Sequence, residues 1–148
     1  MKFTHKLAVT AYLYHHGKFL FLYRNTDPKV WAPPGGHLQV NEPPDTGVSR
    51  EIKEETGLDV KYLFPVSTWF GEWRGNKILS IDYLAEPYDR EVALSEEHSD
   101  YRWVSAEQLK QGHPIELAPV LDLKVSDFEY AEQVFHMLQN NQHIFTNS

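Results

Sequence analysis

Four glutamates, one arginine and two glycines recur at fixed spacing in the first half of this 148-residue chain. The pattern is Gly36-x5-Glu42-x7-Arg50-Glu51-Ile52-x-Glu54-Glu55-x-Gly57-Leu58. Like charges three or four positions apart on a helix repel each other and destabilise it. Clustered carboxylate oxygens are also the ligands that bind Mg²⁺, Mn²⁺ or Ca²⁺, in preference to zinc or copper. The pattern therefore predicts a site for a divalent cation.

A helix must hold these glutamates together, and the sequence predicts one from about Pro43 or Pro44 to Thr56. Proline is tolerated in a first helical turn, and Asn41 is a candidate N-cap. Gly57 suits the left-handed residue that follows a helix.

The predicted helix has two neighbouring faces. Val48, Ile52 and Thr56 form a stripe that should pack on a sheet. The carboxylates of Glu51, Glu54 and Glu55 occupy an adjacent arc of roughly 100°. Arg50 can pair with Glu54, four residues later. One face is thus expected to anchor the helix while the other presents the ligands.

The rest of the sequence predicts an α/β fold. Residues 7–13 alternate as in a strand, and the apolar run 19–23 predicts a strand covered on both faces. Further strands are expected at 60–64, 66–73, 78–85 and 101–104, with a turn at 74–77 and loop at 33–36. A capping box at Ser105 starts a short helix, and an amphipathic helix is expected at about 126–140. Together these elements predict a single-domain α/β/α sandwich with a mixed sheet, spanning 1–148 with its core at about 5–110.

Composition excludes several classes of protein. The absence of cysteine rules out disulfides, thiolate zinc sites and cysteine nucleophiles, and a cytoplasmic location is expected. No apolar run is long enough to span a membrane. With a net charge of −7 and no cluster of Lys or Arg, the chain is not expected to bind a nucleic-acid polymer.

All nine specified positions from Gly36 to Leu58 resemble the Nudix box, the signature of hydrolases acting on nucleoside diphosphates linked to another moiety. Residues 31–38 and 101–104 are similar to the flanks usual in that family. Such a pattern arises by chance in a chain of this length on the order of once in 10⁷. The resemblance implies an α/β/α sandwich, a Mg²⁺ or Mn²⁺ cofactor, and attack of water on a phosphorus of a small diphosphate substrate.

The resemblance also implies roles for single residues. The metal ligands would be Glu51, Glu54 and Glu55, helped by a backbone carbonyl of the Gly35–Gly36 segment. Arg50 is expected to orient a box glutamate, and Glu42 to stabilise the joint between loop and helix. Gln39 departs from the family, because many relatives have glutamate there.

The general base stays open, since the family uses either a box glutamate or one on a distant downstream loop. Glu51 and Glu54 are candidates within the box. Glu96 and Glu97 are candidates in the acidic stretch before the late strand. Any of these carboxylates could take the proton of the attacking water.

Substrate contacts are expected from His37, Arg24 and Trp69. Phe70, Trp73, Tyr12 and Tyr23 could extend an aromatic stacking surface, although aromatic residues in strands more often fill the core. The stripe of the last helix similarly predicts core packing or a homodimer contact.

The box leaves the substrate open, and a (deoxy)nucleoside triphosphate is the default. About 16 residues past the box, neither the proline common in ADP-ribose enzymes nor the tyrosine of dinucleoside polyphosphate enzymes is present. An alternative is a non-catalytic Nudix-fold sensor of a nucleotide metabolite, which the intact box disfavours. The isopentenyl diphosphate isomerases, which share the fold, depend on a cysteine that is absent here.

Overall fold

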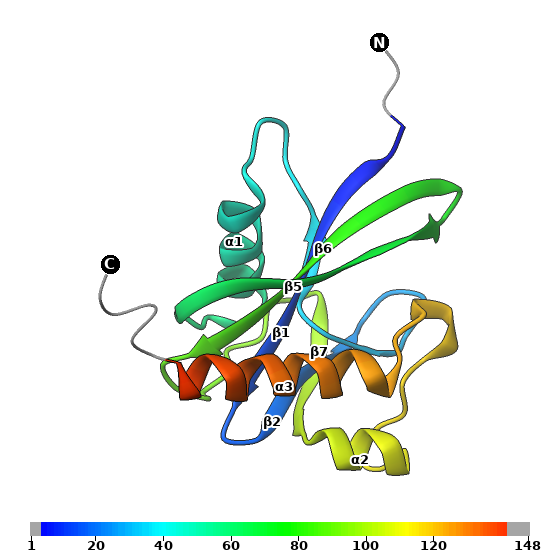
Figure 1. Ribbon diagram of the computed structural model, residues 1–148. Coiled ribbons are helices and arrows are strands. Elements are labelled where there is room, and N and C mark those ends of the chain that lie inside the picture. Colours follow the sequence, from blue (N-terminus) through cyan, green and yellow to red (C-terminus); the bar gives the residue numbers. More distant parts are fainter. Residues whose placement is uncertain (1–3, 142–148) are drawn as a thin grey trace.

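Residues 4–141 are described by the structure, a computed structural model (Figure 1). The elements in chain order are β1 (Lys6–His15), β2 (Lys18–Arg24), β3 (Trp31–Ala32), β4 (Gly35–His37), α1 (Pro44–Thr56), β5 (Val60–Trp73), β6 (Asn76–Pro87), β7 (His98–Val104), α2 (Ala106–Gln111), η1 (Pro119–Leu121) and α3 (Val125–Asn140).

The strands form a mixed sheet in the order β3-β2-β1-β6-β5, with β4 paired to β1 and β7 paired to β2. The β1–β6 pair is parallel, and the other pairs are antiparallel. Strand β1 is central because its first part pairs with β4 and β6 and its last residues with β2. The mixed sheet predicted from the sequence is confirmed.

Helices cover both faces of this sheet, which confirms the α/β/α sandwich (Figure 1). On one face, Val48 and Ile52 of α1 pack against Val9, Leu20 and their neighbours. The other face is covered by α3 and gathers the aromatic core residues Tyr12, Tyr14, Phe19, Phe21 and Phe128. Successive residues of β1 and β2 thus enter opposite cores, as expected of strands covered on both faces.

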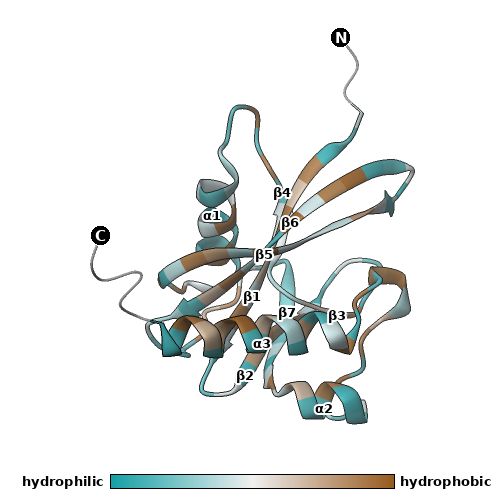
Figure 2. Ribbon diagram, in the orientation of Figure 1, coloured by the Kyte–Doolittle hydropathy of each residue, from teal (hydrophilic) through white to brown (hydrophobic). Residues whose placement is uncertain are grey.

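The stripe of α3 belongs to the second of these cores. Phe128, Ala131 and Val134 are buried, with Phe135 and Leu138 packed against them. Figure 2 shows apolar positions recurring along α3 between hydrophilic ones. Core packing therefore accounts for the apolar stripe of α3. A homodimer stays a prediction, but this stripe does not support it.

Helix α1 begins and ends close to the predicted residues, but Asn41 is not its cap. Pro43 occupies the N-cap position without a side-chain hydrogen bond, and Asn41 has a left-handed backbone with φ of 61°. Gly57 ends the helix with φ of 73°, and its N–H donates to the Lys53 carbonyl, as predicted. The capping box of α2 is also confirmed, since Ser105 and Gln108 bond reciprocally at 3.1 and 2.9 Å.

Several strand boundaries differ from the prediction. Residues 60–73 form one strand rather than two. Proline is tolerated there because β5 is the edge strand of the sheet order and its register shifts between Pro65 and Ser67. Strand β7 begins three residues early, at His98, by pairing with Arg24 of β2. Two short strands, β3 and β4, lie in or beside the expected loop, and Asn76 and Lys77 belong to β6.

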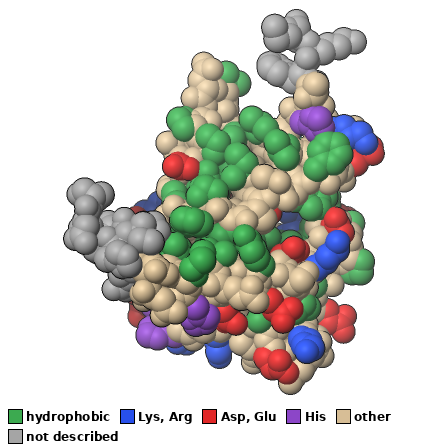
Figure 3. Space-filling model, in the orientation of Figure 1, with side chains coloured by type: hydrophobic (Ala, Val, Ile, Leu, Met, Phe, Trp, Pro, Cys, Tyr) green, Lys and Arg blue, Asp and Glu red, His purple; other side chains and the backbone are tan. Residues whose placement is uncertain are grey.

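The described surface is mixed in character. On the face shown in Figure 3, hydrophobic side chains gather in the middle and acidic ones towards α2 and the start of α3. Within residues 4–141, no helix is long and apolar enough to cross a membrane.

Candidate active site

Glu55 is the most buried of the box carboxylates, with 5% of its surface exposed. Its Oε2 accepts a hydrogen bond of 3.0 Å from the backbone N–H of Gly35, which ties α1 to β4. Glu51 is half-buried beside it, and Glu54 is exposed. The predicted ligand face of α1 therefore extends from the buried Glu55 to the solvent-exposed Glu54.

Arg50 connects the other carboxylates. Its Nε and Nη2 donate to both oxygens of Glu42 at 2.7 and 2.9 Å, and its Nη1 donates to Glu51 at 3.0 Å and Glu54 at 3.1 Å. A bidentate guanidinium–carboxylate pair fixes orientation as well as charge. These bonds lower the pKa of Glu42 to about 2. The predicted Arg50–Glu54 pair is present, within a network larger than expected.

Glu42 also joins the loop to the helix, as predicted. Its Oε1 accepts from the backbone N–H of Gln39 at 3.0 Å, and Arg50 donates to the His37 carbonyl at 3.3 Å. The departure at Gln39 leaves this joint intact, because the contact uses the backbone of that residue.

Gly35 and Gly36, at the start of the box, both lie very close to neighbouring groups. A Cβ on Gly36 would lie 2.6 Å from Oε1 of Glu51, and one on Gly35 would lie 2.4 Å from the Val9 carbonyl oxygen. A larger side chain at Gly35 would push β4 away from β1, whereas one at Gly36 would displace the Glu51 carboxylate. The segment whose backbone carbonyl is expected to help bind metal thus lies against Glu51 and Glu55.

Burial and mutual repulsion make the two inner carboxylates easier to protonate. Burial is the main cause of the raised pKa of Glu55, and the charges of Glu51 and Glu97 add to it. Burial likewise raises the pKa of Glu51, while Arg50 opposes the shift. One arginine does not balance this many carboxylates, so a divalent cation would stabilise their ionised forms.

The start of β7 brings further ligands to Glu55. One ligand atom each of Glu55, Glu97 and His98 lie within 4.8 Å of one another. Glu97 was predicted to join the site. The other candidate of this stretch, Glu96, is not part of this group, and its backbone carbonyl accepts from Asn25 Nδ2 at 2.7 Å. His98 was missed, although its place beside Glu97 was a signal. It is buried with a lowered pKa, and its Nδ1 has no hydrogen-bond partner in the described chain.

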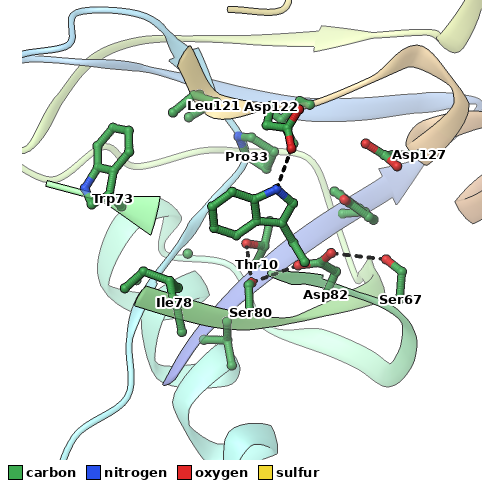
Figure 4. Close-up of a pocket in the computed structure, with 18 of the residues that line it drawn as sticks. Thr10, Pro33, Ser67, Trp73, Ile78, Ser80, Asp82, Leu121, Asp122 and Asp127 are labelled. Carbon is green, nitrogen blue, oxygen red and sulfur yellow. Dashed lines mark hydrogen bonds between the residues drawn. The ribbon is translucent and has the colours of Figure 1, made fainter. Parts of the chain in front are cut away.

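A cavity of about 340 Å³ adjoins the carboxylates, and Gly35 and Gly36 form part of its wall. The three residues expected to contact substrate, Arg24, His37 and Trp69, all line it. Trp73 (Figure 4) and Tyr12 line it as well. The other aromatic candidates do not: Phe70 is exposed against His5, and Tyr23 packs on Trp31.

Several polar residues of the cavity were missed from the sequence. They come from β1, β5, β6, the end of η1 and the first turn of α3: Thr10, Ser67, Ser80, Asp82, Asp122 and Asp127. No motif or spacing connects them along the chain. Their common property is a tertiary one, because each strand contributes one or two side chains to the same cavity.

Known proteins share both the sequence pattern and the fold. The NUDIX domain model matches residues 4–123. The asymmetrical bis(5'-nucleosyl)-tetraphosphatase of Sus scrofa is 34% identical over 114 residues, which cover 72% of this chain and 74% of that protein. Nucleoside triphosphatase NudI of Escherichia coli is 30% identical over 98 residues, or 58% and 69% of the two chains.

Among solved structures, the MutT protein from Methanosarcina mazei Go1 superposes with a TM-score of 0.71 at 26% identity, covering 90% of this chain and 96% of that one. The resemblance seen in the box thus extends over most of the chain and its fold. The chain belongs to the NUDIX family and is a Nudix-type pyrophosphohydrolase.

Proposed function

We propose that this protein hydrolyses the diphosphate linkage of a nucleoside 5′-polyphosphate in a reaction that depends on Mg²⁺ or Mn²⁺. The observation that carries the proposal is the position of the cavity. It shares the Gly35–Gly36 wall with the box carboxylates, so a ligand in the cavity can direct its phosphates towards them.

The cavity has the properties of a nucleoside pocket. Its volume lies at the lower end of the range of small-ligand pockets, about 300–1,000 Å³. Aromatic side chains and a polar floor suit the faces and edges of a base. Arg24 and His37 line the same cavity and can meet the phosphates.

The donor set fits a hard divalent cation. Glu51, Glu54, Glu55 and a carbonyl of the Gly35–Gly36 segment would hold it, and Glu97 is close enough to Glu55 to contribute. When bound, the ion would neutralise phosphate charge and lower the pKa of the attacking water. Arg50 holds Glu51 and Glu54 in place through its hydrogen bonds.

Glu97 is the base that we favour for the water proton. Its carboxylate is exposed beside Glu55, and it stands outside the hydrogen bonds that engage the box glutamates with Arg50. The water oxygen would bond to phosphorus, its proton would pass to Glu97, and the bridging oxygen would leave with the other phosphate.

Relatives narrow the substrate class. The names of the two relatives given above specify a dinucleoside tetraphosphate and nucleoside triphosphates, and both compounds are nucleoside 5′-polyphosphates. The missing tyrosine past the box disfavours the dinucleoside compound here, so a (deoxy)nucleoside triphosphate is the first choice. We place this activity in the cytoplasm, in keeping with the cysteine-free sequence.

A hydrolysis panel tests the proposal. It comprises nucleoside and deoxynucleoside triphosphates, dinucleoside polyphosphates, ADP-ribose, nucleotide sugars and non-nucleoside diphosphates, each assayed with Mg²⁺, Mn²⁺ or EDTA. We expect the highest kcat/KM for a nucleoside 5′-polyphosphate and no turnover with EDTA. Turnover confined to non-nucleoside diphosphates would contradict the proposal. Tight nucleotide binding without any hydrolysis would instead support the sensor alternative.

A further inference from the structure

The floor of the cavity is a chain of hydroxyl groups that ends on one carboxylate. Ser80 Oγ donates to Asp82 Oδ1 at 2.8 Å, and Ser67 Oγ donates to Asp82 Oδ2 at 3.1 Å (Figure 4). Thr10 Oγ1 lies 3.2 Å from Ser80 Oγ. Since the Ser80 proton is already used, Thr10 must be the donor of that pair. We call these four residues, Thr10, Ser67, Ser80 and Asp82, the acceptor cluster.

The hydroxyl protons of the acceptor cluster all point inward, so its oxygens can offer a ligand only lone pairs. The neighbouring residues add to this property. Asp127 lines the cavity from the first turn of α3, and Trp69 directs its Nε1–H to Asp122 at 2.8 Å. Burial is the main cause of the raised pKa of Tyr12, and the charges of Asp82 and Asp127 and a hydrogen bond to Asp82 add to it. The donors around the floor are therefore already directed to carboxylates or hydroxyls.

Asp82 lacks a cationic partner, even though only 5% of its surface is exposed. None of the ion pairs found within residues 4–141 includes it. Arg24, the arginine of the cavity lining, donates through Nε to the Pro28 carbonyl at 3.0 Å. A buried carboxylate without a cation is stabilised by further hydrogen-bond donors, which a ligand can bring.

We propose that the acceptor cluster makes this cavity selective for nucleobases that carry an exocyclic amino group over their oxo counterparts. An amino group donates hydrogen bonds to the free lone pairs of the cluster. An oxo group at the same position places its own lone pairs against them, which is repulsive, and brings no donor of its own to Asp82. The inference rests on the proposed function, because it concerns the base of the nucleotide whose phosphates reach the box carboxylates.

Matched pairs of triphosphates test this selectivity. CTP and UTP form an amino and oxo pair at C4 of the pyrimidine, which also differs in the proton on N3. ATP and ITP form the corresponding pair at C6 of the purine, which also differs in the proton on N1. Each pair has the same sugar and phosphates, so effects at the box carboxylates cancel in the ratio of kcat/KM. We expect at least about a tenfold preference for the amino member of each pair that is turned over.

The outcomes separate the two proposals. Nucleotide hydrolysis with equal kcat/KM within the pairs, or with the oxo member preferred, overturns the selectivity and leaves the proposed function standing. Failure to hydrolyse any nucleotide overturns both.

The Asp82→Asn variant tests whether Asp82 is responsible for the selectivity. The amide adds N–H donors to the floor, so the amino-to-oxo ratio should fall about tenfold towards one. Both substrates are assayed on one preparation, and partial unfolding therefore cancels in the ratio. If this variant does not fold, Asp127→Asn replaces it, with a smaller fall expected because Asp127 is only half-buried.

Asp89→Asn is the matched control, because Asp89 lies on an exposed loop after β6. It should keep the wild-type ratio. An unchanged ratio in both Asp82→Asn and Asp127→Asn would show that these carboxylates do not select the base, and would overturn the inference.

Discussion

One group of carboxylates lines the cavity and another lies behind its Gly35–Gly36 wall, and the two groups differ in how their charge is balanced. The box carboxylates, Glu42, Glu51, Glu54 and Glu55, share Arg50, which contacts three of them. The cavity carboxylates, Asp82, Asp122 and Asp127, form no ion pair among the described residues and accept from hydroxyls, an indole and the backbone.

This difference suggests that the two groups have different tasks: one binds a metal ion and the other recognises a ligand. A set of carboxylates with too few cations attracts a metal ion, whereas a carboxylate surrounded by neutral donors attracts a ligand's N–H groups. The first group suits the phosphates of a substrate, and the second suits its base. Substitutions in each group should therefore have different consequences, and the largest are expected at the box.

Glu55→Gln should have the largest effect. Glutamine can still accept from the Gly35 N–H, so the fold should stay intact, but the ligand charge is lost. We expect turnover to fall by about 10²- to 10³-fold, with a Tm in EDTA no lower than that of the wild type because a buried, repelled charge is removed. Steady-state hydrolysis measures this effect, and Glu129→Gln on the exposed face of α3 is the control. Retained turnover would remove Glu55 from the metal site.

Asp82→Asn should reveal the cost of burying a carboxylate without a cation. Burial raises the pKa of Asp82 from 3.8 to about 6 in the folded protein. The wild type is therefore penalised little at low pH and increasingly as the pH rises through 6. Relative to wild type, the free energy of unfolding of Asp82→Asn should rise by about 2 kcal/mol between pH 4.5 and pH 8.

Urea denaturation of both proteins at the two pH values measures that change. Asp89→Asn should show almost none, because its side chain is exposed. A pH-independent difference between wild type and Asp82→Asn would mean that Asp82 is not desolvated, and would weaken the contrast between the two groups.

Arg50→Lys should lower turnover by about tenfold. A lysine ammonium lacks the planar fork that bonds both oxygens of Glu42 while reaching Glu51 and Glu54. Hydrolysis assays compare it with Arg102→Lys, which changes the exposed arginine paired with Asp100 on β7 at 3.8 Å. Equal rates in both variants would show that the box carboxylates do not need Arg50 to hold their geometry.

Asp122→Ala should have the smallest effect, a rise in KM of about threefold with little change in kcat. The variant frees the Trp69 indole at the cavity but leaves the box carboxylates untouched. Asp59→Ala, which removes an exposed partner of Lys53, is the comparison. A larger fall in kcat than rise in KM would contradict a role limited to the cavity.

The box could be predicted because its parts lie within one loop and one helix. Periodicity placed Val48 and Ile52 in the core and the glutamates beside them, and Gly57 marked the end of α1. The error at Asn41 was local, since a proline took the cap position without a side-chain bond. Glu97 was found through the family resemblance, while its neighbour His98 was not.

The cavity could not be predicted in the same way. Thr10, Ser67 and Asp82 are small polar residues in three strands, and each has an ordinary surface interpretation when read along the chain. Strand β5 was predicted as two separate strands, so the bulge near Ser67 was not predicted.

The sequence by itself determined the carboxylate helix, the fold class and the family, because periodic burial and short-range charge spacing are properties of consecutive residues. Only the tertiary structure decided the surroundings of Asp82. The parallel pairing of β1 with β6 sets Thr10 opposite Asp82, and the antiparallel pairing of β5 with β6 sets Ser67 opposite it. Burial then removes water and leaves the hydroxyls of Ser67 and Ser80 as its hydrogen-bond donors.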